Sequence, residues 1–227
     1  MQVKKTNQLA AQSGVKFVVY GEPGAGKTTL IKTLPGPVLM LSVESGTLAL
    51  RDVAIDVLEV NTYEELMEAY QYIVDHKAEY KSIALDSVSE IAERILENAK
   101  KVKSGWDAYS MMADSIIGLL WKFQKMPGMN VYVSAKMERL QDDNGLLIYG
   151  PDLPGKKAKN ELPYVFDEVF RLHVLKDKQT GATYRKLQTQ PDGKSIAKDR
   201  SGCLAPAEDP DLGAIIEKIL EGVNNGQ

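Results

Sequence analysis

The stretch Gly21-Glu22-Pro23-Gly24-Ala25-Gly26-Lys27-Thr28 decides the fold class of this chain. It follows the apolar run 15–20 and precedes the helix-forming segment 28–34, so the order is strand, glycine-rich loop and helix. Glycines lack a Cβ, which lets successive backbone N–H groups turn toward a phosphate at the positive end of the following helix. The pattern G-x-x-x-x-G-K-[ST] in this setting predicts a nucleotide-binding phosphate loop.

The loop also predicts which groups hold the nucleotide. Lys27 is expected to reach the β- and γ-phosphate oxygens, and the Thr28 hydroxyl is expected to ligate Mg²⁺. The sequence contains no N-K-x-D element for reading guanine, so the expected cofactors are ATP and Mg²⁺. The expected nucleotide contacts are Gly21, Glu22, Pro23, Gly24, Ala25, Gly26, Lys27, Thr28 and Thr29.

Length and composition indicate a single folded domain. The 227 residues fit one α/β domain, which we place at 15–221 between polar tails at 1–14 and 222–227. The net charge of −3 argues against a surface that binds nucleic acid throughout, so such binding needs a local basic segment. No signal-peptide core or membrane-spanning run is visible, which favours a cytoplasmic protein without a membrane partner.

The composition leaves little room for disulfide or cysteine-based metal chemistry. Cys203 is the single cysteine, which excludes an intrachain disulfide and a cysteine cluster around a metal. His76 and His173 are isolated, one on an expected helix and one on an expected strand, so we assign a metal to neither.

The rest of the chain alternates between strands and helices. Apolar runs predict strands at 38–43, 54–60, 82–86 and 130–136. Capping sequences and helical spacing predict helices after Thr62 and Ser87, at about 107–125 and at about 211–221. Two runs within 168–189, separated by Gln179-Thr180-Gly181, predict a β-hairpin. The expected fold class is α/β, with a mostly parallel central sheet flanked by helices and an antiparallel C-terminal hairpin.

Two carboxylates follow expected strands and complete the predicted site. Asp86 ends a short apolar strand, the position from which a carboxylate holds the Mg²⁺ that Thr28 also contacts. Glu44 ends the strand after the lysine-loop helix, where a carboxylate can orient and polarise the attacking water. We therefore expect Asp86 to bind metal and Glu44 to act in hydrolysis.

These motifs together resemble a known family. The phosphate loop 21–28, Glu44, the pair Asp86-Ser87 and the segment 197–202 resemble the RecA-like P-loop ATPases. More closely, the chain looks like the short RecA-like phage proteins of the Sak group of single-strand annealing recombinases. The resemblance extends from Val15 to about Leu220 and implies a RecA-like P-loop NTPase fold. It also implies DNA-stimulated ATP hydrolysis in phage recombination, in the cytoplasm of the host cell.

The resemblance implies an oligomer with shared active sites. Lys198 and Arg200 match a K-x-R pair that RecA-like ATPases project into the nucleotide site of the neighbouring subunit. A cation supplied in this way neutralises charge that develops on the γ-phosphoryl group. The resemblance thus implies a homo-oligomer, a ring or a filament. Ser134 and Lys136 are both candidates for the family's γ-phosphate sensor.

The resemblance also implies single-stranded DNA as a partner, bound through two mobile loops after the later core strands. The first candidate loop is 137–145, with Arg139, and the second is 150–164, with Lys156, Lys157 and Lys159. Cations on such loops would contact backbone phosphates, and Tyr164 could stack on a base. A solvated lysine loop without a ligand is the competing interpretation. A single-stranded-DNA-binding protein is a further candidate partner.

Two other classes of function remain open on the residues alone. A phosphotransferase could use the same loop on a small molecule or nucleotide, with 150–164 as a basic lid and Glu44 as a substrate-binding group. A non-hydrolysing assembly or loader protein could use ATP as a lock. DNA-dependent turnover distinguishes the ATPase from the first class, and turnover that is lost in Glu44→Gln excludes the second.

Overall fold

The computed structural model describes residues 14–44, 46–141 and 145–225. Almost all of the expected N-terminal tail, residues 1–13, therefore lies outside the described residues, as do residues 226–227 of the expected C-terminal tail. Residues 142–144, inside one of the two expected DNA loops, lie outside them as well.

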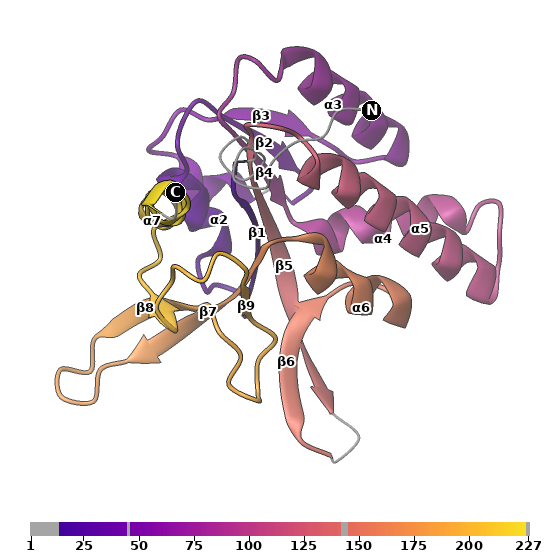
Figure 1. Cartoon of the computed structure of the whole chain (residues 1–227). Coiled ribbons are helices and arrows are strands. Elements are labelled where there is room, and N and C mark those ends of the chain that lie inside the picture. Colours follow the sequence, from indigo (N-terminus) through magenta and orange to yellow (C-terminus); the bar gives the residue numbers. More distant parts are fainter. Residues whose placement is uncertain (1–13, 45, 142–144, 226–227) are drawn as a thin grey trace.

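A mostly parallel sheet forms the centre of the molecule (Figure 1). Six adjacent strands run parallel in the order β7-β1-β5-β4-β2-β3. Their bounds are β1 Lys16–Tyr20, β2 Val38–Ser42, β3 Asp56–Glu59, β4 Ser82–Asp86, β5 Asn130–Gln141 and β7 Glu168–Lys176. The antiparallel additions are β6 Leu147–Asp152, β8 Thr183–Gln188, β9 Lys198–Asp199 and β10 Ala207–Glu208. In this order, β5 separates the strand before the phosphate loop from the strand that ends in Asp86.

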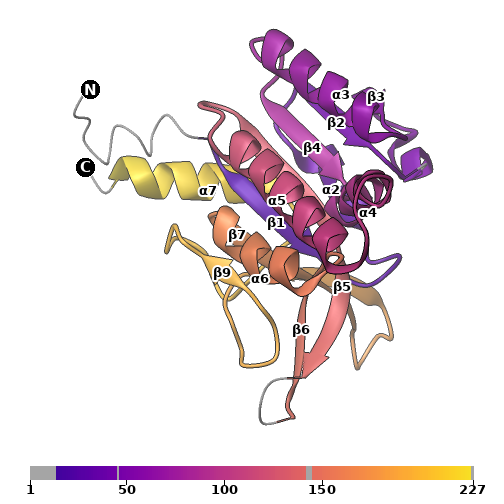
Figure 2. The same ribbon diagram turned by 90° about the vertical axis from the view of Figure 1, so that its right-hand side faces the viewer.

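Helices cover both faces of the sheet (Figure 2). One face carries α3 Tyr63–His76, α4 Val88–Ala99, α5 Gly105–Gln124 and α6 Lys156–Val165. The other carries α2 Lys27–Leu30, the 3₁₀ turns η1 Ile31–Thr33 and η2 Gly46–Leu50, and α7 Leu212–Asn225. None of the helices in the described ranges is long and apolar enough to cross a membrane. The expected fold class, α/β with a mostly parallel central sheet flanked by helices and an antiparallel C-terminal hairpin, is confirmed.

Because helices cover both faces of the sheet, the central strands are unbroken apolar runs in the sequence. In β1, Val18 and Tyr20 face the core under α3 to α6, whereas Phe17 and Val19 face the core under α2 and α7. All four side chains are buried. Because successive side chains of a strand point to opposite faces, a strand buried on both sides must be apolar throughout.

The predicted helix starts are confirmed by their caps. The Thr62 hydroxyl accepts the backbone N–H of Glu65 at 3.1 Å and begins α3. Ser87 begins α4 and accepts the N–H of Glu90 at 3.5 Å. Each cap satisfies a backbone donor that the first helical turn leaves without an intrahelical partner.

The predicted C-terminal hairpin is confirmed as β7 and β8. Its turn contains the expected Gln179-Thr180-Gly181, and the Asp177 carboxylate accepts the N–H groups of Gln179 and Thr180 at 2.9 and 2.7 Å. Gly181 has φ +71°, a left-handed conformation that glycine adopts without strain.

The prediction that 137–145 and 150–164 are loops is wrong for most of their described residues. Residues 137–141 continue β5, which pairs antiparallel with β6 and forms a hairpin that extends away from the body (Figure 1). Residues 150–152 end β6, and 156–165 form α6. The composition of Pro, Gly and Lys suggested a loop, but Ala158, Leu162 and Val165 are spaced to bury one helical face. Tertiary packing therefore overrides the local composition.

α7 supports the helix that follows the phosphate loop. The backbone N–H of Leu212 donates to the Thr33 hydroxyl at 2.9 Å, although 179 residues separate them. Ile215, Ile216 and Ile219 of α7 share a buried cluster with Leu30 and Ile31. The position of α2 thus depends on a segment far along the chain.

Glu168 is a buried acid at the start of β7. Its side chain is 2% exposed, and its Oε1 accepts the N–H of Ser201 at 3.3 Å. Burial raises the pKa of Glu168 to about 8, and the nearby Asp199 carboxylate raises it further. The folded chain therefore holds one more proton than the unfolded chain between pH of about 4.5 and 8.

This extra proton gives a testable pH dependence. The free energy of unfolding should fall as the pH rises through that window, and Glu168→Gln should remove most of the fall. At pH 8 the variant should be more stable than the wild type by about 1–3 kcal/mol, the cost of a poorly satisfied buried group. Urea denaturation at pH 5 and pH 8 checks this, with the exposed Glu161→Gln as the control. Parallel pH profiles for wild type and Glu168→Gln would contradict the assignment.

Candidate nucleotide site

The phosphate loop has the backbone that its glycines predict. Gly24 and Gly26 have φ values of +73° and +104°, which other residues rarely adopt, and α2 begins directly after Gly26. A Cβ at Gly26 would also lie 3.2 Å from Nε of Arg185. The positive φ therefore favours glycine at this position, and a Cβ would also displace the Arg185 side chain by a few tenths of an ångström.

Lys27 lies inside the loop. Its Nζ donates hydrogen bonds to the carbonyl oxygens of Gly21 at 2.9 Å and Glu22 at 3.0 Å. Burial lowers the pKa of Lys27, and the negative charges of Asp86 and Glu44 oppose that shift. The ammonium group thus donates to two carbonyl oxygens, and phosphate oxygens could take their place when a nucleotide binds.

Thr28 and Asp86 lie side by side as predicted for metal binding. The Thr28 hydroxyl donates to Oδ2 of Asp86 at 2.7 Å, and the Ser134 hydroxyl donates to Oδ1. Asp86 is 4% exposed, and both hydroxyls satisfy its charge. Two hard oxygen donors in contact fit Mg²⁺, which binds through a hydroxyl, one or two carboxylates and phosphate oxygens.

Glu44 is fixed by serines on two neighbouring strand ends. The Ser87 hydroxyl donates to Oε1 of Glu44 at 2.7 Å, and the Ser42 hydroxyl donates to the Glu44 carbonyl at 2.7 Å. Because Ser87 directly follows Asp86, the metal-binding and water-orienting candidates are coupled through adjacent residues. Glu44 is exposed to solvent, so water can reach its carboxylate.

These groups line one cavity of 510 Å³, within the range of small-molecule sites. The lining residues are Gly21, Pro23, Gly24, Gly26, Lys27, Thr28, Thr29, Glu44, Ala49, Asp86, Ser87, Lys136, Met137 and Asp152. The predicted metal and water-orienting residues therefore come together with the predicted loop residues, except Glu22 and Ala25, which do not line the cavity. Of the two sensor candidates, Lys136 lines the cavity and is ion-paired to Glu90, whereas Ser134 is fully buried against Asp86.

Two residues that the sequence analysis did not identify hold the loop in place. Nε of Arg185, on β8, donates to the Ala25 carbonyl at 2.7 Å. The hydroxyl of Tyr132, on β5, donates to the Lys27 carbonyl at 2.7 Å. Burial raises the pKa of Tyr132 well above its usual value, so the hydroxyl keeps its proton. Neither residue belongs to a local motif, and only the folded chain brings them to the loop.

Lys198 and Arg200 lie away from this cavity. Lys198 pairs with Val169 near the start of β7, whereas the phosphate loop follows the other end of the parallel strands. Nζ of Lys198 donates to the Pro163 carbonyl at 2.6 Å, and Arg200 donates to Asp167 at 2.8 Å. Neither cation lines the cavity of its own chain.

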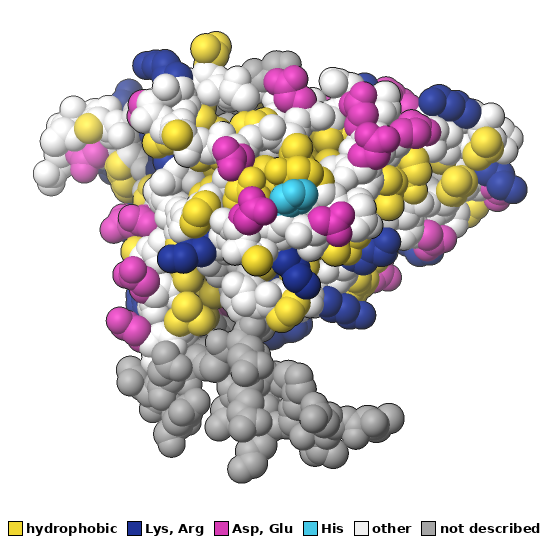
Figure 3. All heavy atoms as spheres, turned by 90° about the horizontal axis from the view of Figure 1, so that it is seen from above, with side chains coloured by type: hydrophobic (Ala, Val, Ile, Leu, Met, Phe, Trp, Pro, Cys, Tyr) yellow, Lys and Arg dark blue, Asp and Glu magenta, His cyan; other side chains and the backbone are white. Residues whose placement is uncertain are grey.

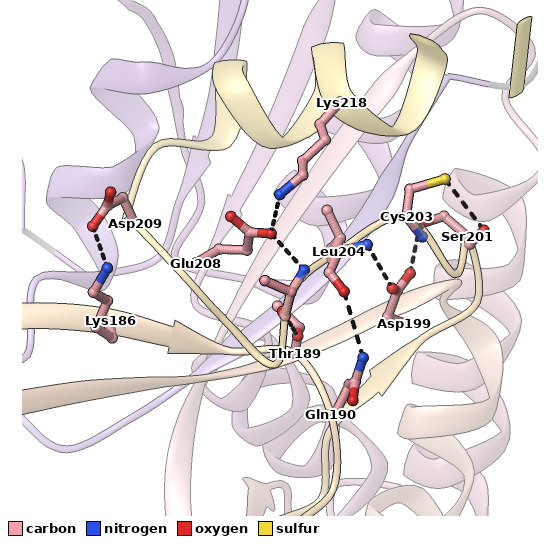
Figure 4. A network of polar contacts seen from close by, with 11 residues as sticks. Lys186, Thr189, Gln190, Asp199, Ser201, Cys203, Leu204, Glu208, Asp209 and Lys218 are labelled. Atoms are coloured by element: carbon pink, nitrogen blue, oxygen red, sulfur yellow. Dashed lines mark hydrogen bonds and ion pairs between the residues drawn. The ribbon is translucent and has the colours of Figure 1, made fainter. Parts of the chain in front are cut away.

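The turn after this pair is held by a polar network (Figure 4). The Asp199 carboxylate accepts the N–H groups of Gly202 and Leu204, both at 3.0 Å, and the Ser201 hydroxyl at 2.5 Å. Further along, Glu208 accepts the N–H of Ala205 and pairs with Lys218 of α7. The segment that carries Lys198 and Arg200 is therefore ordered by its own contacts.

The residues expected to contact DNA are mostly engaged with acids. Arg139 lies 3.7 Å from Glu22 of the phosphate loop, and its guanidinium lies 5.8 Å from the Tyr149 ring centroid. Lys157 pairs with Asp114. Lys159 pairs with Glu138 and with Asp152, the latter at 3.2 Å. Lys156 and Tyr164 are exposed on α6.

Fold and site together define a P-loop ATPase. Residues 13–201 match a protein-family model described as AAA domain, and this chain belongs to that family. A KaiC-like protein from the hyperthermophilic archaeon Pyrococcus horikoshii OT3 is similar in structure. Its TM-score is 0.48, with 15% sequence identity over 77% of each chain. No curated protein sequence matches this chain.

The contact between Tyr132 and the loop can be tested by deleting one oxygen. Tyr132→Phe should lower the free energy of unfolding by about 1 kcal/mol, because the buried Lys27 carbonyl loses a donor. Binding of Mg-ATP, measured by calorimetry, should also weaken by a few fold, since α2 loses its tie to β5. Tyr80→Phe, which removes an exposed hydrogen bond to Asp56, is the matched control and should leave ATP affinity unchanged. Equal effects of the two variants would refute a specific role for Tyr132.

Proposed function

We propose that this chain is an Mg²⁺-dependent ATPase that binds single-stranded DNA in phage-type recombination or annealing, of the kind found in the Sak group. The observation that carries the proposal is the pairing of Thr28 with Asp86 beside Glu44, which is held by Ser87. A phosphate loop alone binds nucleotide, but a fixed and exposed carboxylate in the same cavity supports hydrolysis.

Each residue has a distinct part in the proposed reaction. Lys27 holds phosphate oxygens in place of the carbonyls that it contacts here, and Thr28 and Asp86 hold the metal. A metal ion held by these two residues would supply positive charge that offsets the charge on the phosphates. Glu44 orients a water molecule and accepts its proton, and the Ser87 hydrogen bond keeps the carboxylate turned toward the cavity.

We propose that Lys198 and Arg200 complete the site of a neighbouring subunit in a ring or filament. Their distance from the cavity of their own chain supports action in trans, and the Arg200 side chain is 58% exposed. The pairing of Arg200 with Asp167 positions the guanidinium without burying it. Removing such a cation lowers turnover by about 10³ to 10⁵ in other phosphoryl-transfer enzymes.

We propose that the hairpin of β5 and β6 links DNA to the nucleotide site. Arg139 on this hairpin lies against Glu22 of the phosphate loop, and Lys136 at its base lines the cavity. A strand of DNA that competes with Glu22 for Arg139 would thus alter the loop directly. Lys156, Lys157 and Lys159 on α6 are the further phosphate contacts in this proposal, and a single-stranded-DNA-binding protein is a further partner.

The first prediction for this function concerns turnover. Wild-type ATP hydrolysis should rise with protein concentration and with a single-stranded oligonucleotide, because assembly completes the sites. Glu44→Gln and Arg200→Ala should each lose at least about 10³-fold in kcat while still binding Mg-ATP. A coupled phosphate-release assay measures the rates. A rate indifferent to DNA, to concentration and to Arg200 would overturn the proposal and point to a small-molecule phosphate acceptor.

The second prediction distinguishes action in trans from a structural role of Arg200. Mixing equal amounts of Glu44→Gln and Arg200→Ala subunits should restore about a quarter of wild-type activity. In the mixture, an Arg200→Ala subunit with an intact Glu44 receives Arg200 from its Glu44→Gln neighbour. Mixing Glu44→Gln with Asp86→Asn, both defective in the same cavity, is the control and should restore nothing. Failure of the first mixture to recover would contradict a shared site.

A further inference from the structure

The connection between α4 and α5 is an exposed basic segment to which no role has been assigned. We call residues 100–106, which include the first two residues of α5, the basic turn. Every residue from Lys100 to Asp107 is exposed. Trp106 is 82% exposed and Val102 is 68% exposed, among the largest values for hydrophobic side chains in the described chain. Tryptophan is usually well buried, so a tryptophan open to water at the start of α5 indicates a contact surface.

The charged residues of the basic turn are all positive. Lys100, Lys101 and Lys103 lie within four residues, and no acidic residue occurs between Glu97 and Asp107. The side chains of Lys101 and Lys103 have no ion-pair partner among the described residues. By contrast, Lys157 and Lys159 on α6 are already paired with acids. A polyanion would therefore meet less competition at the basic turn than at α6.

One residue of the basic turn borders a cavity next to the nucleotide cavity. The lining of a second cavity, of 270 Å³, includes Lys100, Tyr109, Lys136 and Asp152. Lys136 and Asp152 line the nucleotide cavity as well. The Lys100 ammonium lies 5.7 Å from the Tyr109 ring centroid, at the boundary between the basic turn and this second cavity. Lys100 thus borders a cavity that shares two lining side chains with the nucleotide cavity.

The figures place this surface at one end of the molecule. In Figure 1 the α4–α5 connection lies at the right-hand edge, on the opposite side from α7. Seen from above in Figure 3, the right-hand end carries Lys and Arg side chains beside hydrophobic ones. A ligand can therefore reach the basic turn without displacing any helix that covers the sheet.

We infer that the basic turn binds a single strand of DNA, with a base stacked on Trp106 and backbone phosphates on Lys101 and Lys103. Proteins that hold single strands combine an aromatic platform with a cationic strip, and this turn presents both within a few residues. A protein partner fits less well, since the cores of protein interfaces are depleted of lysine. The inference rests on the proposed DNA binding and assigns it a surface outside the β5–β6 hairpin and α6.

The experiment measures the affinity of the full-length protein for a fluorescein-labelled oligo(dT) by anisotropy, at several salt concentrations. Trp106→Ala should weaken binding about tenfold, a change of about 1.4 kcal/mol. Trp106→Phe should recover part of that loss because a ring remains. Lys101→Ala/Lys103→Ala should reduce the slope of log affinity against log salt by about 1.4. ATP turnover without DNA should stay at the wild-type rate in all three variants.

Trp121, the other tryptophan of α5, supplies the control. Trp121→Phe should bind oligo(dT) as the wild type does, and its remaining Trp106 fluorescence should be quenched on binding. If wild type binds and the turn variants bind equally well, the inference is wrong while the proposed function stands. If wild type does not bind oligo(dT), both the inference and the DNA part of the proposed function fail. If the basic-turn variants change the mass of the oligomer but not the affinity for oligo(dT), the inference is also wrong, and the turn is a contact between subunits.

Discussion

The buried carboxylate of Asp86 is the interaction on which the nucleotide site depends. It accepts hydroxyl groups from Thr28 on α2 and Ser134 on β5, which lie 58 and 48 residues away in the chain. A buried charge without partners would destabilise the fold by several kcal/mol, so these hydroxyls are required for stability as well as for geometry. They fix the distance between the phosphate loop and the sheet. Ser87, the next residue, donates a hydrogen bond to Glu44 and so fixes that carboxylate relative to Asp86.

The strand order gives the site its mechanical connection to the surface. β5 lies between β1 and β4, so it separates the strand before the phosphate loop from the strand that ends in Asp86. The same strand continues past the sheet into the hairpin with β6. A displacement of the hairpin is therefore transmitted along β5. The same strand provides Tyr132, Ser134 and Lys136 to the site. Because β5 is continuous, a contact made at the hairpin is joined directly to the nucleotide site, without an intervening loop.

The sequence predicted the parts of the site that local patterns encode. The phosphate loop, Asp86 and Glu44 each stand at a strand end that hydrophobic periodicity identifies, and the structure brings them into one cavity. Arg185 and Tyr132 could not be predicted, because their partners lie 160 and 105 residues away and no short motif links them. The helix α6 was missed because its Pro and Gly neighbours suggested a loop, whereas burial against α5 decided its conformation.

The supports of the phosphate loop have a consequence for how the protein is made. The loop lies near the start of the chain, but Arg185 and Leu212, which hold Ala25 and Thr33, are translated far later. These contacts join residues 160 and 179 positions apart, so neither can form until the later partner has been translated. A ribosome-bound chain that has reached Asp86 and β5 already contains the phosphate-binding and metal-binding residues without their outer support. The nascent protein thus passes through a stage in which the motif is present and the rigid pocket is not.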